Sequence, residues 1–516
     1  MGKELLKQLP LYALVALGLT LIFLSNSPLW NSFCADQSMF SVIGANWAEG
    51  KLPYVDTWDS KGPIIFFMNM IGHSLARGEM GIFILQTINL VAVLTLSHYY
   101  LRRHCTLRRT WAYNAVFLMA YTIICSGGNQ VGDTNLVLAV WSVMLIHEWS
   151  RGMAAGRFAH PWGYAFVYGM FAASCLLSRL TNAMLLVWLV AAIALVLMGK
   201  GLWRNLGANI LSFTGGFAVV FVPFAVYFAA HGALGEMWYA MLSYNMEYAL
   251  HSSASAVNDL TPSYPLYFAA YFICLIATVV YAAIAIAKKE KRLQAVVWGA
   301  ASLLTLVWLV RSYCNANYAI SYLPAIFVAM TELGEMGRRW KVARWALYGV
   351  AAYTALFFAN HIRVYRDYMQ KPQEIDPGMA MTRGIGRDEP FVAWEVDPTY
   401  YIYDNRKPCY RFFSMQDWAI ENGPSLRPLM RDCYARGNAK WILVKDTPHC
   451  NIRDILARRY VVVSRDAAHG LTLYRIKRKD PKTHPCPLPT KGGEPNRPQH
   501  GFLHLTKGRL KHPPQT

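Results

Sequence analysis

The chain has 516 residues, of which 55% are hydrophobic and only 16% are charged, whereas a soluble domain carries about 25% charged residues. The apolar residues gather in runs of about 18–24, the length that crosses a hydrocarbon core. The formal charge of +20 does not indicate a nucleic-acid partner, because lysine and arginine gather at the ends of these runs, as the positive-inside rule requires. The composition therefore excludes an ordinary soluble protein and predicts a polytopic membrane protein.

We predict eleven membrane spans along the chain. The first follows Lys3 and Lys7 and has no small-x-small cleavage site, so we expect a retained span and no cleaved signal peptide. The approximate limits of the spans are 11–30, 80–101, 110–126, 133–150, 162–178, 182–199, 207–230, 264–287, 293–310, 317–334 and 343–360.

The distribution of charge between the loops predicts the orientation of these spans. If the N-terminus is cytoplasmic, eighteen lysines and arginines fall on the cytoplasmic side and only five in the short outer loops. This asymmetry is what the positive-inside rule demands. An odd number of spans then sends the C-terminal part, from about His361, to the outer side.

Composition divides the chain into three parts. Residues 1–360 form the membrane part. Residues 361–477 contain the short β-rich runs "EPFVAWEV", "KWILVKD", "RYVVVSRD" and "HGLTLYRIK", which predict a small soluble α/β domain. Residues 478–516 are rich in Pro, Gly, Lys and His and predict a disordered basic tail.

The ten cysteines include no CxxC pair, so their spacing supports neither a metal site nor a redox site. Cys409, Cys433 and Cys450 fall in the predicted soluble domain. They leave room for one disulfide, whose pairing the sequence does not give.

The first outer loop, residues 31–79, is long and patterned. "ADQSMFSVIGANWAEG" places Met39, Phe40, Ile43 and Trp47 at helical spacing and predicts a short interfacial helix. "PIIFFMNMIGHSLARG" is too short to span and predicts a second one. Between them lies "GKLPYVDTWDSKGP" (Gly50–Pro63), a charged, turn-rich segment that we call the hook. A later outer loop, about 231–262, contains the aromatic segment "GEMWYAMLSYNMEYAL".

Several acids and one lysine lie at the outer ends of the predicted spans, where a charge facing lipid is costly. Each has a structural alternative to a functional role. Asp36 and Asp133 would serve as N-caps, and Asp56 and Asp59 as turn residues. Lys61 precedes Gly-Pro just above the bilayer, where it would either meet a phosphate or extend to the headgroups.

Two outer arginines complete this set. Arg179 lies in the very short turn "LSRLTN", and Arg311 begins the polar and aromatic stretch "RSYCNANYAISYLP". Guanidinium groups match phosphate oxygens in a bidentate manner, although both residues could instead anchor their spans or pair with the acids. Charges gathered on one face fit chemistry on a lipid-linked phosphate better than transport, which favours charges near the midplane.

These residues resemble a family pattern over about residues 10–477. An Asp soon after the first span, a helix ending in "WAEGKLPYVDTWDSKGP", and an acid in the next outer loop are similar to bacterial GT-C fold membrane glycosyltransferases. The protein O-mannosyltransferase-like and aminoarabinose transferase-like enzymes are the nearest in pattern. "SYLP" and "VAWEVDPTYYIYDNRKPCYRF" resemble later motifs of that group.

The resemblance implies an inverting hexosyl- or pentosyltransferase of the bacterial inner membrane, with its C-terminal domain in the periplasm. The donor would be a sugar on a polyprenyl phosphate such as undecaprenyl phosphate, and the acceptor a glycan, lipid or protein on the periplasmic side. No cofactor is certain. The fold expected is a helical membrane domain with about eleven spans and two interfacial helices, plus a small α/β domain.

The resemblance also implies roles for individual residues. Asp36 would activate the acceptor as a general base, and Asp133 would position the acceptor or a divalent metal. Cations would stabilise the charge that develops on the leaving phosphate. The candidate donor-phosphate ligands are Lys61, Arg179, Arg311 and Tyr318, and the acceptor-binding or loop-supporting residues are Tyr54, Asp56 and Asp59.

The sequence departs from the family at two places. Asn317-Tyr318 stands where His-Tyr is frequent, and the second acid, Asp133, is frequently Glu. These departures leave the donor sugar open. Two other classes of function also stay open: a polymerase or ligase of lipid-linked glycans, and a flippase or transporter, although the chain shows no internal repeat of the kind found in transporters.

Overall fold

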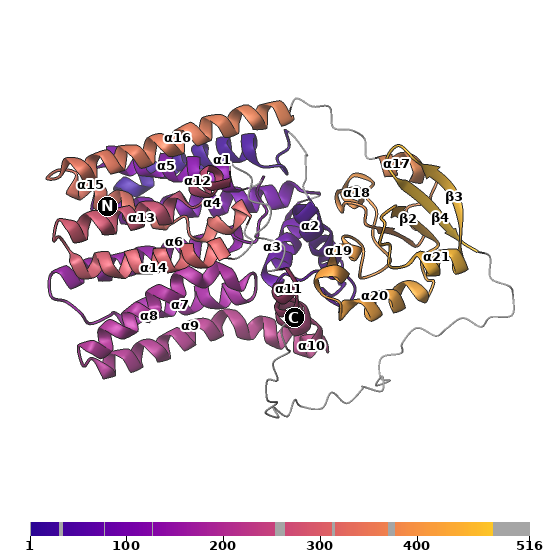
Figure 1. Cartoon of the computed structure of the whole chain (residues 1–516), viewed down its shortest axis with the longest axis horizontal. Helices are drawn as coiled ribbons and strands as arrows, with labels where there is room; N and C mark the ends of the chain where they lie inside the picture. Colours follow the sequence, from indigo (N-terminus) through magenta and orange to yellow (C-terminus); the bar gives the residue numbers. More distant parts are fainter. Residues whose placement is uncertain are drawn as a thin grey trace, which may run out of the picture. The chain divides into compact units, whose positions relative to one another are not determined.

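A computed structural model of the chain describes residues 2–29, 35–76, 78–125, 127–252, 264–311, 315–369 and 377–477. It contains a large helical part and a small sheet domain near the C-terminus (Figure 1). Residues 1–476 form one compact unit. The predicted tail, 478–516, lies outside the described residues.

The helical part follows most of the apolar runs of the sequence, but the first predicted span, 11–30, is displaced, because α1 begins at Gly2 and ends at Phe23. A short 3₁₀ turn precedes α6, α8 and α15, and a π-helical turn separates α10 from α11. The elements are α1 (Gly2–Phe23), α2 (Ala35–Ala48), α3 (Pro63–Leu75), α4 (Met80–Leu101), α5 (Leu107–Ile124), η1 (Asp133–Asn135), α6 (Leu136–Ala154), α7 (Trp162–Leu176), η2 (Leu180–Ala183), α8 (Met184–Gly199), α9 (Trp203–Ala230), α10 (Leu234–Trp238), η3 (Tyr239–Ser243), α11 (Tyr244–Ser252), α12 (Tyr264–Tyr271), α13 (Ile273–Ala287), α14 (Arg292–Arg311), η4 (Ala316–Ser321), α15 (Ala325–Met336) and α16 (Lys341–Met369).

Within the described residues, six helices are long and apolar enough to cross a membrane. A seventh span results if the bent pair Pro265–Tyr271 and Ile273–Ala287, which turns by 84°, is counted as one. The six are Glu4–Phe23, Met80–Leu101, Leu180–Gly199, Trp203–Ala230, Arg292–Arg311 and Lys341–Val364. The remaining predicted spans coincide with α5, α6, α7 and α15, so the total of eleven stays a prediction.

The C-terminal domain is built on four short strands in the order β1-β2-β4-β3. β1 pairs with β2 in parallel, and the other two pairs are antiparallel. Each of the four β-rich runs predicted from the sequence forms one strand. The elements are α17 (Pro377–Thr382), β1 (Phe391–Trp394), α18 (Thr399–Tyr403), α19 (Gln416–Asn422), α20 (Leu426–Ala435), β2 (Trp441–Lys445), α21 (Arg453–Arg459), β3 (Tyr460–Asp466) and β4 (Leu471–Ile476).

The hydrophobic core falls into two clusters. One fills the helical bundle. The other runs from α2, α3 and the hook into the sheet domain without a break. The apolar stripe of α2, formed by Met39, Phe40, Ile43 and Trp47, packs against protein and belongs to this second cluster.

Two other expectations can be compared with the structure. Cys409, Cys433 and Cys450 are all free thiols, so no disulfide forms among them. The helix α16 continues to Met369, past residue 360, where we placed the end of the membrane part.

Candidate functional site

The end of the hook docks on the turn between α7 and η2. The Gly62 amide donates a hydrogen bond to the Ser178 carbonyl (3.0 Å), and the Ile64 amide donates to the Leu177 carbonyl (3.1 Å). A Cβ atom at Gly62 would lie 2.1 Å from the Leu177 oxygen, so only glycine permits this approach. The docking brings Lys61 next to the turn that carries Arg179.

Tyr54 and Asp56 shape the hook from within. Tyr54 is fully buried and has a φ of +70°, a strained conformation for a residue with a side chain. Its hydroxyl donates to the Lys61 carbonyl at 2.8 Å. The Asp56 carboxylate accepts from the Leu52 amide at 2.7 Å. Both contacts hold the loop, and neither residue joins the charged cluster described below.

Two further contacts tie the hook to distant parts of the chain. The Asn245 side chain, just after the π-helical turn Tyr239–Ser243, donates to the Ser60 carbonyl at 2.7 Å. The Trp58 amide donates to the Arg411 carbonyl of the sheet domain at 2.8 Å. Single π-helical turns are frequent at functional sites, and this one supports the residue that precedes Lys61.

Polar and charged side chains from four segments of the chain gather around Lys61. Its ammonium lies 3.7 Å from the Asp59 carboxylate. Burial lowers the pKa of Lys61, but the carboxylates of Asp59 and Asp36 more than offset this and leave the pKa above its usual value, so the ammonium stays charged. Arg179 and Tyr318 also lie within electrostatic range of Lys61. The Arg179 guanidinium stacks over the Tyr318 ring at 4.1 Å.

The cluster contains buried polar atoms without a hydrogen-bond partner in the described part of the chain. Arg179 Nη1 and Asp59 Oδ2 are two of them. The neighbouring turns η2 and η4, which pack together, supply the others. They are Thr181 Oγ1, Asn182 Nδ2 and Oδ1, Asn317 Oδ1 and Ser321 Oγ. Buried polar groups are normally satisfied, so this concentration marks a place where a polar ligand would complete the hydrogen bonding.

Asp133 lies to one side of this cluster. Its carboxylate accepts from the Tyr121 hydroxyl and from the Gln130 amide, each at 2.9 Å. It therefore closes the turn that leads into α6 and lines a small cavity of about 60 Å³. Gln130 connects it to the cluster, because the Gln130 side chain accepts from Asn317 at 2.6 Å.

Arg311 ends α14 with an exposed side chain, and among the described residues it makes no contact with Lys61 or Arg179. The sequence did not single out three polar residues that support the site: Asn182, Gln130 and Asn245. Asn182 follows Arg179 in "SRLTN", and Gln130 belongs to "SGGNQVGDTN", so the polarity of both segments was visible. The sequence around Asn245 did not indicate a role, because its hydrogen bond to Ser60 depends on the π-helical turn.

No group of three or more His, Cys, Asp or Glu residues in the described ranges is arranged to hold a metal ion.

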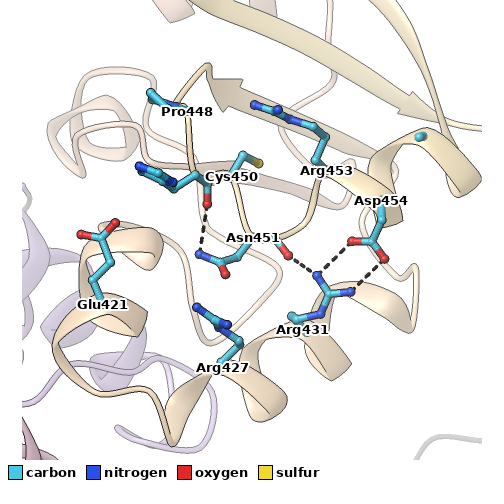
Figure 2. Close-up of a pocket in the computed structure, with 10 residues that line it drawn as sticks. Glu421, Arg427, Arg431, Pro448, Cys450, Asn451, Arg453 and Asp454 are labelled. Carbon is cyan, nitrogen blue, oxygen red and sulfur yellow. Dashed lines mark hydrogen bonds and ion pairs between the residues drawn. The ribbon is translucent and has the colours of Figure 1, made fainter.

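A separate arginine-lined cleft of about 800 Å³ lies in the sheet domain (Figure 2). Arg431 is held by a bidentate pair with Asp454 (2.9 and 2.8 Å) and by the Asn451 carbonyl. Arg453 donates to the Thr447 carbonyl at 3.0 Å. Because an acid of the same domain already neutralises its central arginine, this cleft is a weaker candidate for a phosphate than the cluster at the hook.

A helical membrane part whose first outer loop forms two helices, followed by a small sheet domain, defines the class: the chain has the GT-C fold. It matches the crystal structure of ArnT from Cupriavidus metallidurans bound to undecaprenyl phosphate with a TM-score of 0.60 and 13% sequence identity, over 92% of this chain and 98% of that one. The apo state of ArnT matches with a TM-score of 0.57 at the same identity and coverage.

An oligosaccharyltransferase from Archaeoglobus fulgidus, in complex with Zn and sulfate, also matches at 13% identity, over 84% of this chain and 68% of that one. Its TM-score of 0.38 is too low to support an argument. No family model matches the sequence, and no curated protein is similar to it. The likeness to ArnT confirms the fold class predicted from the sequence, and at this identity it shows the fold alone.

Proposed function

We propose that the protein is an inverting membrane glycosyltransferase that takes a sugar from a polyprenyl phosphate, such as undecaprenyl phosphate, and passes it to an acceptor on the outer face. The observation that carries this proposal is the cluster around Lys61. It combines two cations from different loops with buried polar atoms that lack partners. The GT-C fold supports the same direction, since ArnT of that fold is bound to undecaprenyl phosphate.

Lys61 and Arg179 would bind the donor phosphate. The ammonium acts as a point charge, and the guanidinium offers a fork of N–H groups that fits phosphate oxygens. Stacking on Tyr318 fixes the plane of the guanidinium and leaves Nη1 free to donate. Asn317 and Asn182 would orient the remaining oxygens of the phosphate or the first hydroxyls of the sugar.

In the transfer step, an acceptor hydroxyl attacks the anomeric carbon of the donor sugar. A new C–O bond forms, the bond from the anomeric carbon to the phosphate oxygen breaks, and its electron pair stays on the phosphate. The proton of the hydroxyl passes to Asp36 as general base. Lys61 and Arg179 stabilise the charge that appears on the leaving phosphate, and a single displacement inverts the anomeric centre.

We further infer that all eleven predicted spans cross the membrane, with a cytoplasmic N-terminus. This orientation places the hook, η2 and η4 on the outer side with the sheet domain. Asp133 would then act on the reaction through Gln130 and Asn317, and Arg311 would meet the donor only if the phosphate extends beyond Arg179.

The test compares lysines of the same loop in the full-length protein in nanodiscs. Lys61→Ala is expected to weaken binding of undecaprenyl phosphate about tenfold or more, because a hydrogen bond to a charged group contributes about 1.5–3 kcal/mol. Lys51→Ala is the matched control, since Lys51 is exposed and lies outside the cluster.

Asp36→Ala should abolish sugar transfer while binding of undecaprenyl phosphate persists. Equal binding by both lysine variants, or full transfer by Asp36→Ala, would contradict the proposal.

A further inference from the structure

A second polar cavity lies on the other side of α2. It has a volume of about 650 Å³ and is lined by α2, by the residues on either side of α4's start, and by the segment of the sheet domain that includes α18. At about 100° per residue, its α2 residues Ser41, Val42 and Ala45 lie on the face away from Asp36, and Asn46 lies at the edge of that face. The cavity is therefore separate from the cluster around Lys61.

The free polar atoms of this cavity accept hydrogen bonds. Asn26 is 4% exposed and Asn46 is 2% exposed, and the side-chain oxygens of both lack a partner in the described part of the chain. The amide nitrogen of each is already used: Asn26 donates to Gln86 at 2.8 Å, and Asn46 donates to the Val42 carbonyl at 2.9 Å. Two residues that line the cavity thus each carry a buried side-chain oxygen that lacks a donor.

A buried acid adds to this excess of acceptors, because a carboxyl group keeps an acceptor oxygen whether or not it is protonated. Glu79 is only 10% exposed and accepts a hydrogen bond from the Ser41 hydroxyl. The Ser41 hydroxyl also meets His73 Nε2 at 2.9 Å. Burial lowers the pKa of His73, so its ring is neutral at pH 7 and supplies no charge to balance the acid. Glu79 therefore has no cationic partner among the described residues.

The cations that line the cavity are already engaged. Arg406 is buried and pairs with Asp404 at 2.8 Å, and it also donates to two backbone carbonyls. Lys407 pairs with Glu49 at 2.5 Å. Among the described residues that line the cavity, an anionic ligand would therefore find no unpaired cation, whereas a ligand rich in hydroxyl groups would find acceptors.

We propose that this cavity is a saccharide-binding subsite for a sugar without phosphate or carboxylate groups, held through hydroxyl groups that donate to Asn26, Asn46 and Glu79. Its volume falls within the range of about 300–1,000 Å³ typical of small-molecule sites. We assign this sugar to the acceptor glycan, at a position away from the reacting hydroxyl, and this assignment rests on the proposed function. Binding of the sugar itself does not.

The experiment measures sugar binding to the full-length protein in phosphatidylglycerol nanodiscs by ligand-observed NMR. The probes are cellobiose, maltose, chitobiose, glucose and glucose 6-phosphate, with phosphoethanolamine as a lipid-headgroup probe. We expect at least one neutral sugar to bind, and glucose 6-phosphate to bind at least tenfold more weakly than glucose. Binding of no neutral sugar, equal binding of the phosphorylated sugar, or binding of phosphoethanolamine alone would overturn the proposal.

Variants locate the bound sugar. Asn46→Leu and Asn26→Leu keep the side-chain volume and are each expected to raise the dissociation constant about tenfold, the effect of losing one hydrogen bond. Asn422→Leu is the matched control, because Asn422 makes the same bond to the carbonyl four residues earlier (2.9 Å) but lies in α19 outside the cavity. Unchanged binding by both cavity variants would overturn the assignment. If they fail to fold, Glu79→Gln, which keeps the shape of the acid, should weaken binding in their place, and unchanged binding by it would overturn the proposal.

Lys61→Ala separates this proposal from the proposed function. It should bind undecaprenyl phosphate more weakly and still bind the sugar, as expected for two separate sites. Loss of sugar binding in Lys61→Ala would contradict a separate subsite. If the protein binds a sugar in a manner that depends on Asn46 but never transfers a sugar, the result supports the subsite and contradicts only the proposed function.

Discussion

At the scale of single residues, Gly62 determines whether Lys61 and Arg179 can meet. Its amide donates a hydrogen bond to the Ser178 carbonyl. At this short separation, a Cβ atom on residue 62 would lie 2.1 Å from the Leu177 oxygen and clash with it. Backbone atoms cannot move aside as a flexible side chain can. The position of Lys61 therefore depends on the absence of a side chain at its neighbour.

We predict that Gly62→Ala separates the hook from the α7–η2 turn and weakens undecaprenyl phosphate binding at least as much as Lys61→Ala does. Gly163→Ala is the matched control, because a Cβ atom at Gly163 would meet nothing within 4 Å. Isothermal titration with the lipid in nanodiscs measures the effect. Wild-type affinity in Gly62→Ala would show that the close approach does not position Lys61.

Glu79 is a buried acid outside the donor cluster whose pKa lies near neutral pH. Burial raises its pKa to about 7, partly offset by the Ser41 hydrogen bond. The folded state thus holds a proton that the unfolded chain releases above its pKa of about 4.3. The stability from this proton is complete below the unfolded pKa and is lost as the pH rises through about 7.

We expect Glu79→Gln to remove this pH dependence. Relative to the wild type, the variant should gain apparent thermal stability as the pH rises from about 4.5 to 7.5, by at most about 3 kcal/mol, because one pKa unit corresponds to about 1.36 kcal/mol. Thermal unfolding curves of both proteins across this range measure it. Parallel pH profiles for the two proteins would show that Glu79 is ionised without cost in the folded state.

At the scale of secondary-structure elements, a network of charges centred on a buried acid joins α15 to α6 and to Lys291, the residue before α14. Glu332 is fully buried and contacts His147 (2.9 Å), Arg151 (2.6 Å) and Lys291 (2.9 Å). Glu335 shares both Arg151 and Lys291 but is 44% exposed. Removing one partner of a buried ion pair is strongly destabilising because the other charges stay behind without compensation.

Glu332→Gln is therefore expected to destabilise the bundle by about 3–5 kcal/mol, and Glu335→Gln by much less, since exposed pairs contribute about 0–1 kcal/mol. Thermal unfolding in one detergent ranks the two variants. A drop in unfolding temperature of the same size for both would mean that burial of Glu332 does not set the strength of this network.

At the scale of the whole molecule, the hook joins three regions: the α7–η2 turn, the π-helical segment and the sheet domain. The second hydrophobic cluster includes residues of the hook, of the π-helical segment and of the sheet domain. Trp58 shows this directly, because its ring packs on Tyr244 from α11 and on Phe412 from the sheet domain. The loop that carries Lys61 is thus supported by the domain that we expect to face the acceptor.

The sequence predicted elements well and contacts poorly. The apolar runs gave the helices and the β-rich runs the strands, because hydrophobic periodicity is a local property. The sequence singled out Lys61, Arg179 and Tyr318 one by one, but their contact depends on Gly62 and on the packing of η2 against η4.

The sequence did not indicate a role for Asn26 or Asn46, because a buried oxygen without a hydrogen-bond partner can be recognised only in three dimensions. Asp133 illustrates the opposite case, a candidate whose carboxylate is engaged by its own turn and Tyr121.

The central claim is that the cluster at the hook binds the donor phosphate. A cryo-EM map of the full-length protein with undecaprenyl phosphate in nanodiscs tests it most directly. We predict phosphate density within about 3 Å of both the Lys61 ammonium and the Arg179 guanidinium, the length of a charge-assisted hydrogen bond, with the lipid tail leading into the membrane. Phosphate density in the arginine-lined cleft of the sheet domain, with none at Lys61, would contradict the claim.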